Sequence, residues 1–159
     1  MTGFAIAKLA SIAVTIALSI SPAHAVDVRA CHAAPDHLTR AWNIAEPWEA
    51  ETRTYANGAV RLAVIDTIEP ALGAFHLMIL SPPFGPAGSR TCTLVSANAP
   101  GIGFAGLSLE GIEARYDPAA GLSFVVSARR PDPATGGTFP DRLTLLLNQA
   151  TGTVTVGFP

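Results

Sequence analysis

The stretch TRTYANGAVRLAVID, residues Thr52 to Asp66, decides how the rest of this chain can be organised. Two segments able to form strands flank Asn57-Gly58, and Asn-Gly is well suited to a type I′ turn, which needs positive φ at both central residues. We therefore predict a two-stranded hairpin over this stretch. In its second strand, alternate residues from Val60 to Val64 are apolar and should face a core. Because an isolated hairpin is marginal in water, later segments must pair with it and cover it.

The later part of the chain supplies such segments. Ala74 to Ser81 is apolar on both faces, which is typical of a central strand. The turns Asp117-Pro118-Ala119-Ala120-Gly121 and Asn148-Gln149-Ala150-Thr151-Gly152 each separate two segments in which apolar residues alternate, and the final Gly supplies positive φ. Roughly seven to nine short strands joined by such turns predict an all-β fold, an antiparallel hairpin-rich domain that is either a β-sandwich or a small β-barrel.

The first 25 residues have the pattern of a secretory signal peptide. Lys8 precedes an uncharged apolar run, residues 9–20, and Ala23-His24-Ala25 places small residues at the positions of a cleavage site. At about twelve residues, the apolar run is short for a bilayer span, which needs about 20. We therefore predict cleavage after Ala25, a periplasmic or secreted location, and no transmembrane segment in the mature chain.

After this signal peptide, residues 1–25, we expect an irregular N-terminal segment, residues 26–47, and then one antiparallel β domain, residues 48–159. Pro35-Asp36 favours a short helix in the first of these, since Asp36 would lie near the helix start. The formal charge of the whole chain is only −2, which gives no reason to expect nucleic acid or an anionic membrane as a partner. We expect the partner to be another protein or an envelope component, and the sequence indicates no cofactor.

The chain has two cysteines, Cys31 and Cys92. In an exported protein the default is a disulfide between them, and closing a loop of about 61 residues is worth on the order of 4 kcal/mol in the chain-entropy model. The alternative is a metal site formed by Cys31, His32 and His37. Their spacing matches no zinc pattern, and the chain has no Cys-x-x-Cys for redox chemistry, so the disulfide is favoured.

His76 is the one histidine inside a predicted strand, and Asp66 and Glu69 precede it closely. The three could form a metal site or an acid–base set, provided that they converge in one pocket. A strand histidine is more often a hydrogen-bonded structural residue. Gly101-Ile102-Gly103-Phe104-Ala105-Gly106 fits the letters of a dinucleotide-binding motif, but the chain has no β-α-β pattern to give that motif its meaning.

Two further features concern binding. Trp42 and Trp48 are expected to pack against the sheet, with an aromatic ligand platform as the alternative. The Pro- and Gly-rich stretches Pro82 to Gly88 and Arg129 to Pro140 are expected to be exposed loops, where binding residues tend to lie. Arg129-Arg130 could bind an acidic partner or simply end a strand in solvent.

The favoured function is that of an exported, non-catalytic binding or accessory protein that meets its partner through these two loops. The alternative is a small secreted hydrolase or metal-dependent enzyme centred on His76, Asp66 and Glu69. The combination of a signal peptide, one cysteine pair and a small antiparallel β-domain resembles exported protease- or lysozyme-inhibitor domains of bacteria. That resemblance is one of general form, and it assigns no role to any residue.

Overall fold

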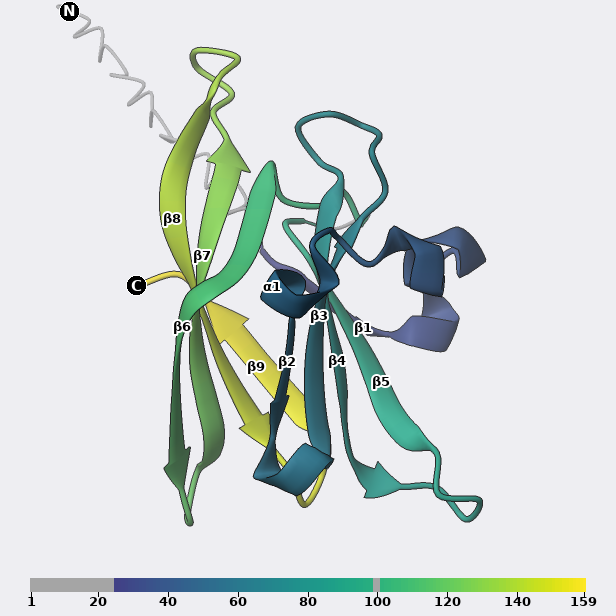
Figure 1. The fold of residues 1–159 in the computed structure, drawn as a ribbon. Helices are drawn as coiled ribbons and strands as arrows, with labels where there is room; N and C mark the ends of the chain where they lie inside the picture. The colour runs from purple at the N-terminus through teal and green to yellow at the C-terminus, as the bar shows by residue number, and fades with distance from the viewer. Residues whose placement is uncertain (1–24, 99–100) are drawn as a thin grey trace, which may run out of the picture.

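Two antiparallel β-sheets make up most of the computed structural model, which describes residues 25–98 and 101–159 (Figure 1). The first sheet has five strands in the order β1-β5-β4-β3-β2, and the second has four in the order β6-β7-β8-β9. The strands are β1 Asp27–Ala30, β2 Thr52–Tyr55, β3 Val60–Asp66, β4 Phe75–Phe84, β5 Arg90–Ser96, β6 Gly106–Asp117, β7 Gly121–Pro131, β8 Thr138–Asn148 and β9 Thr153–Gly157. The prediction of an antiparallel all-β domain is confirmed, and these strands form two sheets rather than one closed barrel.

The helices are short. They are the α-helix α1 Trp48–Glu51 and the 3-10 helices η1 Cys31–Ala33, η2 Asp36–Thr39, η3 Ala41–Asn43 and η4 Ala56–Gly58. Within the described ranges, no helix has the length and hydropathy that a bilayer crossing requires. The predicted signal peptide, residues 1–25, lies outside the described residues apart from Ala25.

The hairpin predicted around Asn57-Gly58 is present as β2 and β3. The Ala59 N–H donates to the Ala56 carbonyl over 3.1 Å, and Asn57 and Gly58 have φ values of 53° and 85°, so both central residues have the positive φ expected of a type I′ turn. The ladder nevertheless stops one pair before the turn, at Tyr55–Val60. Ala56 itself has a φ of 52°, and a residue in that left-handed conformation cannot continue an extended strand.

The inner faces of the two sheets share one hydrophobic core. Val60, Leu62 and Val64 of β3 all contribute to it, as the alternation in the sequence predicted. The Tyr55 and Phe124 rings meet across the two sheets, with their centroids 4.9 Å apart. The buried residues of this core come from both sheets and are Ala45, Val60, Leu62, Val64, Leu77, Ile79, Val95, Ala97, Phe104, Leu107, Leu109, Leu122, Phe124, Val126, Ala128, Leu143, Leu145 and Leu147.

The N-terminal segment covers part of the outer face of the first sheet. A disulfide joins Cys31 to Cys92 of β5, and Ala34 and Leu38 pack with Leu94 in a second, smaller apolar cluster. In this structure residues 26–47 contain strand β1 and three separate 3-10 helices, where the sequence suggested one short helix. The disulfide therefore fastens a covering layer to the sheet, and alternate residues of β3 to β5 are buried beneath that layer.

Helix α1 connects the two sheets through a carboxylate. Glu51 accepts hydrogen bonds from Ser108 Oγ and from the Leu109 N–H, each over 3.0 Å. This contact lies where β6 departs from regular pairing, because the register with β7 shifts between Ser108 and Glu113. The Glu51 carboxylate therefore supplies a hydrogen-bond acceptor for β6 backbone that is irregularly paired at this bulge.

The two loops expected to meet a partner lie at opposite ends of the fold. β4 continues through Pro82-Pro83 as far as Phe84, with a register shift after Ser81, so the first loop is shorter than predicted. The β8–β9 turn packs there, since a Cβ on Gly152 would lie 2.9 Å from Pro83. Residues 132–137, between β7 and β8, lie at the other end (Figure 1). The two loops therefore cannot form one continuous contact surface.

Candidate functional site

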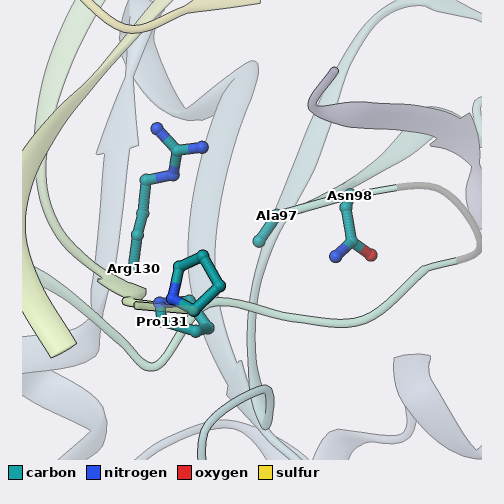
Figure 2. A pocket seen from close by; sticks show the side chains of 5 residues that line it. Ala97, Asn98, Arg130 and Pro131 are labelled. Carbon is teal, nitrogen blue, oxygen red and sulfur yellow. The ribbon is translucent and has the colours of Figure 1, made fainter. Parts of the chain in front are cut away.

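A small pocket lies where the segment after β5 meets the end of β7 (Figure 2). Its volume is about 190 Å³, which suits a side chain or a chain terminus better than a complete small-molecule ligand, whose sites usually exceed about 300 Å³. Arg130 rises on one side, and Ala97 and Asn98 lie on the other. Pro131 and Pro133 complete the lining.

The Arg130 guanidinium is held in a fixed orientation. Its central carbon lies 4.2 Å from the ring centroid of Phe158 and 5.7 Å from that of Phe139. Its Nη1 donates to Asp141 Oδ2 over 3.3 Å. A guanidinium has five N–H donors, and within the described part of the chain this is the one hydrogen bond that it makes. The remaining donors are therefore available to a ligand.

Asn98 lines the opposite side of the pocket from Arg130 (Figure 2). The Asn98 backbone is fixed, since its N–H donates to the Ile102 carbonyl over 3.3 Å and its carbonyl accepts from the Gly101 N–H over 2.8 Å. Its side-chain oxygen is buried without a hydrogen-bond partner among the described residues. In Figure 2 the amide nitrogen lies on the side of Ala97, and the oxygen lies on the far side. The Arg130 guanidinium suits an anionic acceptor such as a carboxylate, and the Asn98 amide lies across the pocket from it.

His76 lies on the outer face of the first sheet, and its contacts are those of a structural residue. Its side chain is 2% exposed, and its Nδ1 is 2.8 Å from Ser96 Oγ. The pKa of His76 is lowered to about 4, chiefly by burial and to a lesser extent by His37 and Arg29, while Asp27 acts in the opposite direction. The imidazole is therefore neutral at neutral pH and hydrogen-bonded within the fold.

The three residues of the enzyme hypothesis are not brought together. Asp66 pairs with Phe75, and His76 pairs with Ile65, so Asp66 and His76 point to opposite faces of the same sheet. Asp66 Oδ1 accepts the Ile68 N–H over 2.8 Å, which uses that carboxylate in a local turn. The described ranges contain no group of three His, Cys, Asp or Glu side chains able to hold a metal ion.

The structure also limits the functions that the cysteine cluster, the Gly-rich stretch and the two tryptophans can have. The sulfur of Cys31 is bonded to Cys92, so it cannot act as a thiolate ligand beside His32 and His37. The Gly-rich stretch that resembles a dinucleotide-binding motif leads into strand β6 and not into a helix. Trp42 and Trp48 are 76% and 51% exposed. The expectation that they pack against the sheet is therefore wrong. Phe104 and Phe124 are the buried aromatic rings of the core instead, and Tyr55, Phe75 and Phe158 pack against it.

Sequence reasoning singled out Arg130 but missed the residues that orient it. Asp141 and Phe139 lie on the neighbouring strand β8, and Phe158 follows β9, so the order of the second sheet places all three near Arg130. Asn98 follows β5 of the first sheet, and the packing of the two sheets brings it to the same pocket. Comparisons of the chain with protein-family models, with curated proteins and with solved structures found no match.

Proposed function

We propose that this protein is an exported, non-catalytic binding or accessory protein, and that it holds a carboxylate of another protein or of an envelope component at Arg130. The observation that carries this proposal is the orientation of the Arg130 guanidinium, stacked on Phe158 beside the small pocket. Export is supported by the sequence pattern of residues 1–25, and the Cys31–Cys92 disulfide is compatible with an oxidising compartment.

The fixed guanidinium favours binding for an entropic reason. Arg side chains carry about 2 kcal/mol of rotamer entropy, and a ligand that must order such a side chain gives up part of its affinity. Here the stacking on Phe158 and the ion pair with Asp141 already order it. Since Asp141 offsets part of the charge, a single carboxylate fits the site better than a highly charged anion.

The carboxylate claim can be tested with small probes on purified protein. Sodium acetate should shift the backbone amide NMR signals of Ala97, Asn98 and Arg130, whereas acetamide, which is neutral and of nearly the same shape, should not. Arg130→Gln should abolish the acetate response. Arg129→Gln is the matched control, because Arg129 is the next residue on β7, is exposed, and bonds to Thr138 Oγ1 instead. An unchanged response in Arg130→Gln would refute the assignment.

The same pair of variants tests the biological partner. Wild-type protein and Arg129→Gln should capture the same partner from an envelope extract, and Arg130→Gln should capture less of it. Equal capture by all three proteins would show that the partner does not depend on this guanidinium.

A further inference from the structure

A second hollow lies at the opposite end of the fold from Arg130. It consists of two adjoining depressions of about 320 Å³ and about 430 Å³, which share Tyr116 and Gln149. β7 runs from Gly121 to Pro131, and at about 3.3 Å per residue its two ends are roughly 30 Å apart. The hollow is therefore distinct from the Arg130 pocket. Its remaining lining residues are Ala56, Pro118, Ala119, Ala120, Gly121, Leu122, Asn148 and Ala150.

The walls of this hollow are two rigid turns. Asp117 Oδ1 accepts the backbone N–H groups of Ala119 and Ala120 over 2.7 and 3.0 Å, which fixes the β6–β7 turn. Asn148 Oδ1 accepts the N–H of Ala150 over 3.0 Å and the next N–H over 3.2 Å, which fixes the β8–β9 turn. The site is thus formed before any ligand arrives, and little ordering cost remains for binding.

Close backbone packing holds these two turns against each other. A Cβ on Gly121 would lie 2.3 Å from the Leu147 carbonyl oxygen, a separation that no side chain tolerates. Gly121 also has a φ of 116°, which lies outside the range that other residues readily adopt. Glycine at this position is therefore a condition for the close approach of β7 to the end of β8.

The lining combines one exposed ring with uncharged polar groups. Tyr116 is 65% exposed, so its ring is open to a ligand. Gln149 is half-buried, and its carboxamide makes no hydrogen bond within the described part of the chain. The Asn148 amide N–H2 has no acceptor among the described residues, because the turn uses only the oxygen, so it can donate to a ligand. None of the lining residues of either depression is charged.

We propose that this hollow binds a neutral saccharide. A pyranose ring has a flat C–H face, which would pack on the Tyr116 ring, and a rim of hydroxyl groups that both donate and accept hydrogen bonds. Carboxamides of Gln149 and Asn148 match such a rim because they also offer both donors and acceptors. An anion would find no cation in this lining, and a wholly apolar ligand would leave the buried part of Gln149 without a hydrogen-bond partner.

The test uses three neutral trisaccharides, cellotriose, maltotriose and triacetylchitotriose, each titrated into the purified protein and followed by backbone amide NMR. At least one should shift the Ala119, Ala120 and Gln149 signals with a Kd of about 1 mM or tighter. Tyr116→Ala should weaken that Kd about tenfold or more, and Tyr116→Phe should change it less than about threefold because the ring is kept. Thermal unfolding of each variant verifies the fold.

Trp42→Ala is the matched aromatic control, since Trp42 is exposed but does not line the hollow. It should leave saccharide binding unchanged. The proposal is overturned if none of the three sugars shifts these signals at about 10 mM, if Tyr116→Ala binds as the wild type does, or if a sulfated sugar binds more tightly than the neutral ones. None of these outcomes depends on acetate binding at Arg130, so the saccharide proposal and the carboxylate proposal are tested independently.

Discussion

Breaking the Cys31–Cys92 disulfide should lower the free energy of unfolding by about 4 kcal/mol. The two cysteines are 61 residues apart, and cross-linking a loop of that length removes about 14 cal/mol/K of entropy from the unfolded chain, which is about 4 kcal/mol at 25 °C. Domains of this size have total stabilities of about 5–15 kcal/mol. The double variant Cys31→Ser, Cys92→Ser should therefore remain folded at 25 °C, with about 1–11 kcal/mol of stability left.

The bond should also have a local effect, because it fastens the N-terminal segment, residues 26–47, to the outer face of the first sheet, which this segment covers; we call this segment the N-terminal cover. Leu94 is 0% exposed beneath Ala34 and Leu38. Without the disulfide, the remaining attachments of the cover include the β1–β5 ladder and the hydrogen bond from the Ala45 N–H to the Val64 carbonyl. The cover should then open more often than the second sheet does.

Unfolding in guanidinium chloride measures the change in the free energy of unfolding, and amide hydrogen exchange measures local opening of the N-terminal cover. Exchange should accelerate first in β5 and in the cover, while β7 and β8 remain protected until global unfolding. Wild-type protein treated with dithiothreitol is the matched control, since it lacks the same bond and retains both cysteines. A loss below about 1 kcal/mol, or exchange that accelerates equally in both sheets, would refute the reasoning about loop closure and about the cover.

Three further perturbations test other parts of the structure. Because the pKa of His76 is about 4 when folded and 6.5 in an ordinary environment, the unfolded state binds more protons between these values. Stability should therefore fall as the pH drops from about 6.5 to about 4, by up to about 3 kcal/mol. His76→Asn should flatten this pH dependence in denaturant titrations. An unchanged pH dependence in that variant would contradict the assignment to His76. Leu145→Ala should cost about 2–5 kcal/mol because Leu145 is 3% exposed, whereas Leu146→Ala, at a neighbouring residue on the other face that is 36% exposed, should cost less than about 1 kcal/mol; equal losses on chemical denaturation would mean that the face assignment of β8 is wrong. Glu51→Ala should cost about 1–3 kcal/mol because two donors of β6 lose their acceptor, while Glu49→Ala, in the same helix and exposed, serves as the control in thermal melts and should have little effect.

Features that depend on neighbours in the sequence could be predicted without the structure. The Asn57-Gly58 turn, and the turns that end at Gly121 and Gly152, follow from residues a few positions apart. The alternation in β3 identified the face that joins the core. The disulfide was predictable because the chain offers only one possible pair of cysteines.

Features that depend on which strands lie side by side could not be predicted. The exposure of Trp42 and Trp48 and the burial of His76 against Ser96 result from the N-terminal cover and from the order of the first sheet. The same holds for the site at Arg130, whose ring and amide neighbours are distant in sequence.

The amino-acid sequence by itself determined that the chain forms short antiparallel strands with defined turns and a single cross-link. Turn geometry and strand alternation depend on residues close together in the sequence, and the chain has one possible cysteine pair. Each can therefore be read directly from the order of the residues. The tertiary structure alone decided that the strands form two sheets, that the two predicted loops lie at opposite ends, and that Arg130 and Asn98 line one pocket. The physical reason is that sheet order and sheet-on-sheet packing depend on contacts between distant segments, and many pairings of the same strands satisfy the same local pattern.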